Sequence, residues 1–387
     1  MISVAKGQAL LFGMAPRMDL EQVPLRQANG RVFHGTVTAD RDQPPFSSSA
    51  MDGYAVIQDG RSDWHVVGES AAGRGHGHAI GPGQAVRIFT GAPVPPNADR
   101  IVIQEDVTVS GDTITLGPDA DTRPYIRPAG GDFQAGFAIH GPKVIGPADI
   151  SLMAAMNAPV LPVARCPDVA IIATGDELVQ PGEAPALDQI IASNALALAA
   201  LVESAGATTR ILPIAKDRTT ALTQAFEWAG TADLVITIGG ASVGDHDLVG
   251  AVARTVGFAP EFYKLAMRPG KPLMAGKRGQ SVHVGLPGNP VSSLVCGHVF
   301  IVPLIKHMLG HPAPMPTYHT ATLAKDMGPN GPRAHYMRAC LDGDQIAPFD
   351  RQDSSLMHIL TQANALLVRA PNEPEQPAGA SVPYLNL

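Results

Sequence analysis

The strongest constraint on the fold is an alternation of strand-like and helix-like segments that begins at Cys166. Residues 169–173 form a continuous apolar run, which is typical of a parallel strand buried on both faces of its sheet. Helices are expected over 191–204 and 219–228. The strand-like segments between and after them are 210–214, 234–238 and 281–284. This alternation predicts a doubly wound α/β domain over residues 166–314.

The segments on either side of this domain have a different pattern. Residues 1–38 and 137–165 are compatible with helix and predict an N-terminal helical or linker domain. They enclose a β-rich insert at 39–136, and the short strands of the tail predict a small C-terminal β domain at 315–387. Each β-rich part contains a hairpin-turn sequence, at 110–112 and at 342–344.

The composition excludes several classes of protein. The chain has 28 Lys and Arg against 35 Asp and Glu, a net charge of −7, which argues against nucleic acid as the main partner. Cys166, Cys296 and Cys340 are widely spaced and form no CxxC pair, which disfavours a disulfide framework and a zinc site. Glycines and prolines interrupt the uncharged stretch 279–305, so we expect no membrane span and a cytoplasmic protein.

Three strand ends of the α/β domain carry loops that suit a ligand, at 174–177, 239–247 and 285–293. Ligands of open α/β sheets bind at the carboxyl ends of the strands. In the third loop Asn289 suits an N-cap and Pro290 a first helical turn, so Ser292 would lie at a helix start that favours an anion. Each loop alone also fits simple turn chemistry, but three on one sheet edge predict a site.

Charge is divided between the two halves of the α/β domain. Residues 168–261 contain 12 acids and four bases, whereas residues 262–325 contain seven bases and no acid. Glu177, Asp217 and Asp247 all follow predicted strands, which suits Mg²⁺ bridging to a phosphate. The alternative for these carboxylates is a solvated acidic face.

A short basic turn lies in the second half. Pro269 and Gly270 separate Arg268 from Lys271 and make the turn rigid. Guanidinium and ammonium donors at this spacing match a tetrahedral oxyanion. A surface turn with solvated bases is the alternative.

Six motifs occur in the order of a known family. They are SAMDGYA at 49–55, TGAPVP at 90–95, TGDEL at 174–178, the loop at 239–247, RPGKP at 268–272 and GLPGNPVS at 285–292. Together they resemble the molybdopterin molybdenumtransferases, the MoeA type that is also seen as the gephyrin E domain. The resemblance spans the whole chain. It implies an elongated four-part subunit, a homodimer, and insertion of molybdate into adenylylated molybdopterin with Mg²⁺ assistance and release of AMP.

The resemblance also implies roles for individual residues. Molybdate would be held by Arg268, Lys271, Ser292, Arg333 and Ser354. Catalytic residues would be Asp52, Thr90, Asp132, Glu177 and Asp217, and Mg²⁺ ligands would be Glu177, Asp217 and Asp247. The adenylylated pterin would be bound by Arg127, Gly239, Gly240, Ser242, Gly244, Lys264, Pro287 and Asn289.

Four of these residues lie in or next to the insert and would reach the site of the other subunit; they are Asp52, Thr90, Arg127 and Asp132. Without the resemblance, Asp52 and Thr90 would be interpreted as turn caps before Gly53 and Gly91. Two other functions stay open at this point: a molybdopterin adenylyltransferase, and a scaffold that binds pterin without turnover. A molybdopterin adenylyltransferase and other cofactor-assembly proteins are the expected partners.

Overall fold

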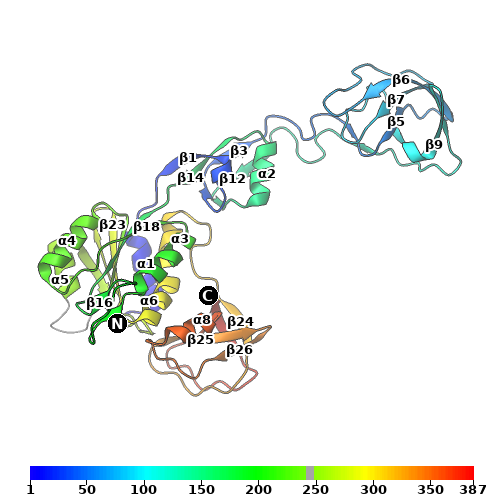
Figure 1. Cartoon of the computed structure of the whole chain (residues 1–387). Helices are drawn as coiled ribbons and strands as arrows, with labels where there is room; N and C mark the ends of the chain where they lie inside the picture. Colours follow the sequence, from blue (N-terminus) through cyan, green and yellow to red (C-terminus); the bar gives the residue numbers. More distant parts are fainter. Residues whose placement is uncertain (241–247) are drawn as a thin grey trace.

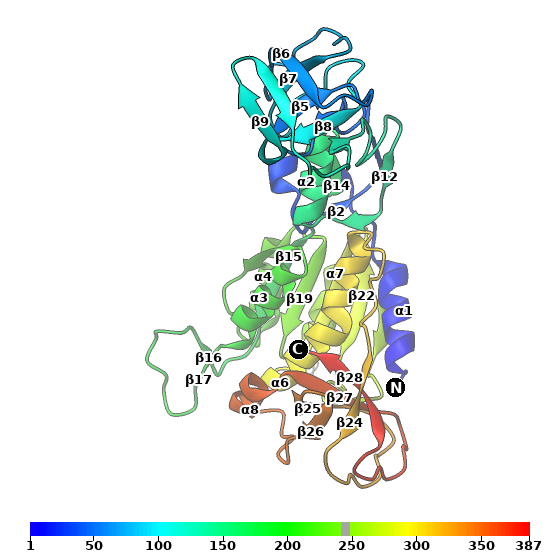
Figure 2. The same cartoon turned by 90° about the vertical axis from the view of Figure 1, so that its right-hand side faces the viewer.

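The computed structural model describes residues 1–240 and 248–387 and has four parts arranged along an elongated molecule (Figure 1). The β-rich insert lies at one end, and two long connections join it to a small N-terminal domain. Next come the central α/β domain and the C-terminal β domain, which Figures 1 and 2 both place far from the insert. The predicted architecture of a central α/β domain, a β-rich insert and a small C-terminal β domain is confirmed.

The central domain contains a six-stranded sheet with the order β18-β15-β19-β23-β22-β20. The first four strands are parallel, and the last two are antiparallel to their neighbours. The strands are β15 (Asp168–Ala173), β18 (Thr208–Ile211), β19 (Leu234–Ile238), β20 (Ala259–Tyr263), β22 (Met274–Arg278) and β23 (Ser281–Leu286). β18 ends earlier than the predicted 210–214 segment, which contains Pro213, a residue without an N–H for a further ladder bond.

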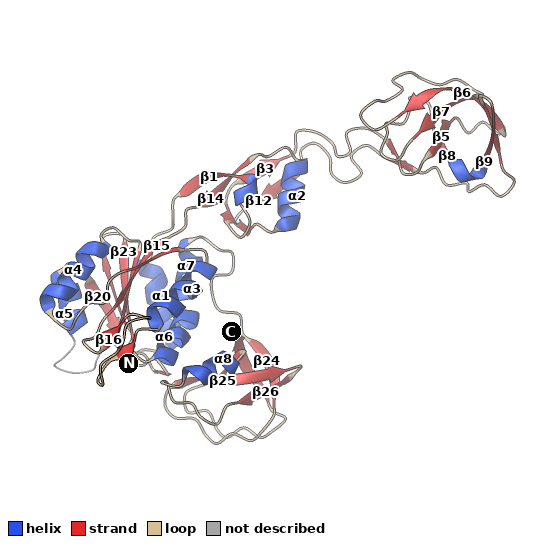
Figure 3. Ribbon diagram, viewed as in Figure 1, coloured by secondary structure: helices blue, strands red, loops and turns tan. Residues whose placement is uncertain are grey.

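Helices cover both faces of this sheet, as a doubly wound fold requires (Figure 3). One face carries α1 (Val4–Met14), α3 (Asn194–Ser204), α6 (Pro290–Cys296) and α7 (Val302–Met308), and the other carries α4 (Thr219–Ala229) and α5 (Leu248–Thr255). The largest apolar core of the described residues lies on the first face, where Ile171, Ile236 and Phe300 are fully buried.

Helices α6 and α7 join through a π-helical turn, η3 (Gly297–Ile301), into one apolar helix of 19 residues. Pro303 follows this turn and has no N–H for the carbonyl four residues earlier, which accounts for the local change in helical pitch. By length and composition this helix could cross a membrane, but 72% of its most apolar window is buried inside the protein. Its apolar surface is therefore used by the core of the central domain.

The first helix differs from the expectation that residues 1–38 form part of a separate helical domain. Leu11, Met14 and Met18 are buried in the core of the central domain. Gln8 is also buried there, and its Nε2 donates a hydrogen bond to the carbonyl of Val299 at 2.9 Å. The apolar face of α1 thus packs against α7 and η3. These elements lie almost 300 positions later, so sequence spacing could not indicate the contact.

The small N-terminal domain is built on a sheet rather than on helices. Its four strands have the order β1-β14-β2-β13, a short pair β3–β12 lies beside them, and α2 packs on the core that contains Phe33 and Met153. The elements are β1 (Leu20–Pro24), η1 (Leu25–Gln27), β2 (Val32–Phe33), β3 (Thr36–Thr38), β12 (Ala138–His140), β13 (Lys143–Val144), α2 (Pro147–Ala155) and β14 (Val160–Ala164).

The insert has a six-stranded sheet with the order β8-β5-β7-β6-β10-β9 and a separate pair β11–β4. Its elements are β4 (Ser48–Ser49), β5 (Gly53–Val56), β6 (Asp63–Ser70), β7 (Gln84–Ile88), β8 (Arg100–Ile103), η2 (Gln104–Asp106), β9 (Val107–Ser110), β10 (Thr113–Leu116) and β11 (Ile126–Arg127). The predicted hairpin at 110–112 is confirmed, because Ser110 pairs with Thr113 across the turn.

The C-terminal domain is a closed barrel of five strands. The order β25-β26-β24-β28-β27 closes on itself because β27 also pairs with β25. The elements are β24 (His319–Leu323), β25 (Ala334–Asp342), β26 (Gln345–Pro348), α8 (Met357–Gln362), β27 (Ala365–Arg369) and β28 (Ser381–Asn386). A two-residue strand of the central domain, β21 (Met267–Arg268), adds to β25 in parallel and joins the two domains.

We expect Leu11→Ala to lower the unfolding free energy of the central domain by about 2–5 kcal/mol, because it leaves a cavity between α1 and the core. The loss of unfolding free energy is measured by urea denaturation, in the transition that belongs to the central domain. Ala9→Ser, on the exposed side of the same helix, is the control and should change stability by less than about 0.5 kcal/mol. Equal effects of the two substitutions would contradict the docking of α1.

Candidate functional site

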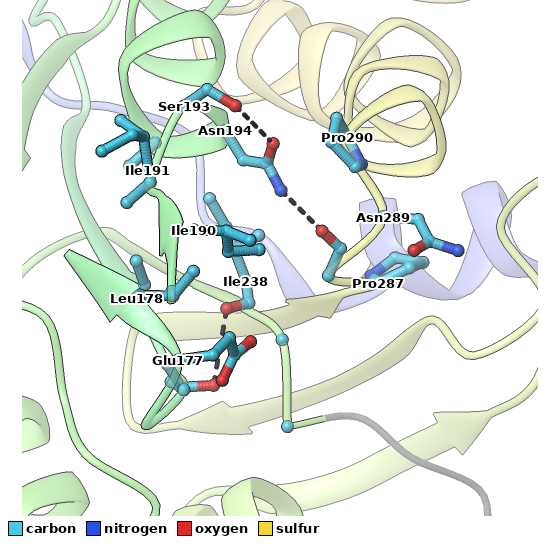
Figure 4. Close-up of a pocket in the computed structure, with 18 of the residues that line it drawn as sticks. Glu177, Leu178, Ile190, Ile191, Ser193, Asn194, Ile238, Pro287, Asn289 and Pro290 are labelled. Carbon is cyan, nitrogen blue, oxygen red and sulfur yellow. Dashed lines mark hydrogen bonds between the residues drawn. The ribbon is translucent and has the colours of Figure 1, made fainter. Parts of the chain in front are cut away.

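A cavity of about 620 Å³ opens at the carboxyl ends of the parallel strands. Loops after β15, β19 and β23 line it, with Glu177, Gly239 and Asn289 among their residues. Figure 4 shows Glu177, Leu178, Ile190 and Ile191 on one side of this space and the segment Pro287 to Pro290 on the other. The three loops singled out in the sequence therefore meet, apart from residues 241–247 of the second loop, which lie outside the described residues.

The floor of the cavity depends on the backbone shape of Gly239. Its φ is +96°, and a Cβ at this position would lie 2.7 Å from the carbonyl oxygen of Thr174. Any side chain would therefore clash with the neighbouring strand end. Gly239 and Gly240, both predicted to bind the pterin, form part of the cavity lining.

Carboxylates gather at one end of the cavity. Glu177 and Asp217 line it, and the backbone N–H of Asp217 donates to Oδ1 of Asp176 at 3.3 Å. Partial burial and the nearby charges of Asp176 and Glu177 raise the pKa of Asp217 above its ordinary value of 3.8. The described residues contain no group of three or more His, Cys, Asp or Glu side chains arranged to hold a metal ion. Asp247, the third predicted ligand, is outside the described part of the chain.

An apolar arm forms the wall next to these acids. Strands β16 (Leu178–Val179) and β17 (Ile190–Ile191) pair in parallel, and the arm projects from the body of the central domain in Figure 2. Leu178, Ile190 and Ile191 line the cavity, and Ile190 is 58% exposed. An exposed isoleucine beside a cavity offers an apolar surface to the flat face of a ligand.

Opposite this wall, Asn194 at the start of α3 fixes the third loop. Its Nδ2 donates to the carbonyl of Gly288 at 2.7 Å, and Ser193 Oγ donates to its Oδ1 at 3.3 Å (Figure 4). The sequence analysis did not select Ser193 or Asn194, or the arm residues Ile190 and Ile191. Ser193 and Asn194 lie inside the helix predicted over 191–204, whereas α3 begins at Asn194. A Ser-Asn pair was the available signal for this later start, because both residues are common at helix N-caps.

The basic residues lie at the junction of the central and C-terminal domains. Strand pairing sets Arg268 directly opposite His335, and paired residues place their side chains on the same face of a sheet. Arg333 lies beside them and its Nη1 donates to the carbonyl of Met267 at 3.5 Å. Burial, followed by the charges of Arg268 and neighbouring arginines, lowers the pKa of His335 to about 4. This histidine is therefore neutral near pH 7, and the arginines supply the positive charge.

The basic turn packs against α6. Gly270 has φ +110°, and a Cβ there would lie 2.5 Å from Sγ of Cys296. Ser292 lies four residues before Cys296 and on the same face of α6, so it faces the basic turn 268–271. Its side chain is buried, with 5% exposed. Lys271 is exposed and precedes Pro272, which lines the cavity. Lys264 also has a positive φ, of +73°, and its ammonium lies 5.3 Å from the ring centre of Tyr263.

Ser354 connects the two domains at the start of α6. Its Oγ accepts a hydrogen bond from Asn289 Nδ2 at 2.9 Å, and its carbonyl accepts one from the N–H of Val291 at 3.1 Å. Asn289 is the N-cap residue, as predicted, but its side chain makes no capping bond to α6. The N–H of Val291 is already used by the carbonyl of Ser354, so this donor of the first turn is not available to an anion.

The insert residues are far from the cavity within one chain (Figure 1). Asp52 and Thr90 bind each other: the N–H and Oγ1 of Thr90 donate to Oδ1 of Asp52 at 2.7 and 2.8 Å, and these bonds lower the pKa of Asp52. Arg127 and Asp132 are exposed in the same region. The structure thus does not bring these four residues to the cavity of their own chain. Ser242 and Gly244 lie outside the described residues.

Comparison with known proteins identifies the class. Models described as the MoeA N-terminal region (domain I and II), a probable molybdopterin binding domain and the MoeA C-terminal region (domain IV) match residues 2–157, 170–307 and 320–387. A molybdopterin biosynthesis MoeA protein from Pyrococcus horikoshii has a similar structure, with 25% identity, coverage of 100% of this chain and 99% of that one, and a TM-score of 0.85. The fold is that of a MoeA-type protein of molybdopterin biosynthesis.

Curated relatives narrow the class to one family of enzymes. Molybdopterin molybdenumtransferase 2 of Mycobacterium tuberculosis is 35% identical over 385 residues, 95% of each chain. The molybdopterin molybdenumtransferase of Nostoc sp. is 34% identical over 327 residues, 80% of this chain and 75% of its own. The chain belongs to the molybdopterin molybdenumtransferase family.

We expect Asp217→Asn to stabilise the protein near pH 7 in the absence of metal. The native state raises the pKa of Asp217, so the penalty for its charge is complete above that pKa and disappears as the pH falls through 3.8. Thermal unfolding between pH 7 and pH 4 should therefore show a gain for the variant that shrinks on acidification. Asp119→Asn, at an exposed carboxylate of the insert, is the control. A gain that is constant with pH, or a loss at pH 7, would contradict the interpretation.

Proposed function

We propose that this enzyme inserts molybdate into adenylylated molybdopterin, with release of AMP, and so forms molybdenum cofactor. The names of its relatives supply the reaction class. The observation that carries the proposal is the contact between two unlike sites: a basic junction around Arg268 and Arg333, and a cavity with carboxylates at Glu177 and Asp217. The turn 268–272 borders both, because Arg268 pairs with the C-terminal barrel and Pro272 lines the cavity.

The basic junction is the molybdate site in this proposal. Arg268, Lys271 and Arg333 supply positive charge, and Ser292 and Ser354 supply hydroxyl groups for the oxygens of a tetrahedral dianion. The neutral ring of His335 can accept a hydrogen bond from an arginine, or donate one to an anion, without adding charge. A molybdate ion held here would stand next to the cavity that takes the pterin.

The cavity is the site for adenylylated molybdopterin. Its volume of about 620 Å³ lies in the range of small-molecule sites, and Ile190 and Ile191 provide an apolar wall for a ring system. The glycine backbone at 239–240 leaves room for the phosphates to approach the strand end. The role of the chain is to hold the two substrates side by side, which removes most of the entropic cost of their meeting.

The carboxylates fit Mg²⁺ as an assisting ion. Oxygen ligands are those that Mg²⁺ prefers, and it commonly uses one or two carboxylates together with substrate phosphates. Burial, followed by the charges of Asp176 and Glu177, raises the pKa of Asp217, and a cation would relieve the second of these effects. Glu177 and Asp217 would hold the ion, which when bound supplies positive charge to the phosphoanhydride oxygens. Asp217 and Glu177 would also orient the attacking group at the anhydride.

Asp52, Thr90, Arg127 and Asp132 complete the site from a second copy in this proposal. The insert is carried on long connections away from its own cavity, so a partner subunit is the source from which these residues reach it (Figure 1). The enzyme is therefore proposed to be a homodimer. A cytoplasmic location and an association with a molybdopterin adenylyltransferase stay predictions.

The reaction itself separates this function from the alternatives. Purified protein is incubated with adenylylated molybdopterin, Mg²⁺ and molybdate, and AMP is measured. Molybdate-dependent AMP release supports the proposal. Consumption of ATP with unadenylylated molybdopterin would indicate an adenylyltransferase, and pterin binding without AMP release would indicate a scaffold.

We expect Lys271→Ala to weaken molybdate binding by about 1.5–3 kcal/mol, or about 10- to 150-fold, the scale of a hydrogen bond to a charged group. Titration calorimetry with molybdate measures the change. Lys277→Ala, on β22 and outside the cavity lining, is the control and should bind molybdate as the wild type does. An unchanged affinity in Lys271→Ala would remove this residue from the anion site.

A shared site also predicts complementation between two inactive variants. Asp52→Ala and Lys271→Ala are co-expressed with different tags, and mixed dimers then contain one intact site. Because half of the dimers are mixed at random assembly, the total activity should reach about a quarter of the wild-type value. AMP release by the unfractionated mixture measures this value, and the tandem-purified mixed dimer, with one intact site of two, should reach about half of the wild-type activity. Activity no higher than that of either variant alone would mean that Asp52 does not act across the interface.

A further inference from the structure

Arg338 is a buried cation that the proposed reaction does not use. It lies on β25 and is 1% exposed, among the largest of the fully buried side chains. Its guanidinium donates to three backbone carbonyls: Arg351 at 3.2 Å, Asp353 at 2.9 Å and Leu356 at 2.9 Å. All three belong to one segment, which we call the 351–356 loop.

The same loop is also held by the backbone of Arg338. The N–H of Arg338 donates to Oε1 of Gln352 at 3.1 Å, and Nε2 of Gln352 donates back to the carbonyl of Arg338 at 2.9 Å. One residue of β25 therefore makes five hydrogen bonds with the 351–356 loop. A segment without regular secondary structure is in this way tied to the wall of a closed barrel.

The outer side of the loop reaches the site. Ser354 bonds to Asn289 and Val291 at the start of α6, and Ser355 lines the cavity. The described residues show no salt bridge for Arg338, and burial lowers its pKa. The charge of Asp353 opposes this lowering but forms no salt bridge with Arg338. A buried charge without an ion pair is costly, and an apolar side chain of similar size could fill the same volume. The charge is useful here because a planar guanidinium can bind several carbonyls at once.

We propose that Arg338 is a positioning residue of the molybdate site: it holds the 351–356 loop so that Ser354 lies against the start of α6. The inference rests on the proposed function for its ligand, but the position of the loop is a property of the protein alone. Arg338 touches no substrate and acts through Ser354.

Arg369 provides a matched control. It is also a buried arginine of the C-terminal barrel, 3% exposed, and it donates to the carbonyls of Gly328 at 3.1 Å and Pro374 at 2.7 Å. These partners lie within the C-terminal domain and away from the 351–356 loop. Arg369→Lys and Arg338→Lys each keep a positive charge and lose the planar donor group. They differ in which segment they release, and Arg369 also has a salt bridge with Glu373 at 3.1 Å.

The first measurement uses the ligand-free full-length protein. Arg338→Lys should speed hydrogen exchange of the Val291 amide, which donates to Ser354, and of the Ser355 amide, which donates to Asp353 Oδ1 at 2.9 Å. Arg369→Lys should leave both amides as in the wild type. Unchanged exchange in Arg338→Lys, or equal changes in both variants, would overturn the proposal even if the enzyme has another substrate.

The second measurement uses molybdate. Arg338→Lys should raise the molybdate Kd and KM about tenfold while kcat at saturating molybdate stays within about twofold. In a Ser354→Ala background the same substitution should change Kd less than about twofold, because its effect passes through Ser354. Additive effects, or a normal Kd in Arg338→Lys, would overturn the positioning role. A wild-type protein that does not bind molybdate would reject the proposed function instead, and the exchange measurement would still decide the role of Arg338.

Discussion

The pairing of β21 with β25 is the contact on which the site depends. It is only two residues long, yet it joins the central domain to the C-terminal barrel and sets Arg268 opposite His335. The closed barrel holds β25 on both edges, because β27 pairs with residues 335–339 and β26 with residues 339–342. Arg268 is therefore held by one domain and oriented by the other, and Arg333 lies at the start of the same strand.

Separation of charge is the second constraint. The cavity brings Glu177 and Asp217 together, and burial followed by the charges of Asp176 and Glu177 raises the pKa of Asp217. At the junction, burial followed by the charges of the arginines lowers the pKa of His335. Charges of one sign held together without counter-ions destabilise the ligand-free protein, but they favour binding of ligands of the opposite charge. The acidic end of the cavity and the basic junction therefore keep opposite charges that are available to ligands.

The loops of the α/β domain were predictable because they rest on local rules. Parallel strands appear as apolar runs, their carboxyl ends share one edge, and Gly and Asn-Pro sequences mark the turns there. Other site features depend on chain segments far apart in sequence. The arm residue Ile190, the Asn194–Gly288 hydrogen bond and the anchoring of Ser354 by Arg338 carry no motif of their own, since ordinary residues acquire these roles through packing.

The sequence by itself determined the α/β alternation, the glycine-rich strand ends and the division of acids from bases, since each follows from residue type and short spacing. Tertiary structure alone decided that α1 packs into the central core, that Arg268 joins a strand of another domain, and that Asp52 lies far from the cavity of its own chain. The physical reason is that burial and strand pairing between distant segments depend on the fold of the whole chain. Periodicity and turn chemistry, in contrast, depend on about a dozen neighbouring residues.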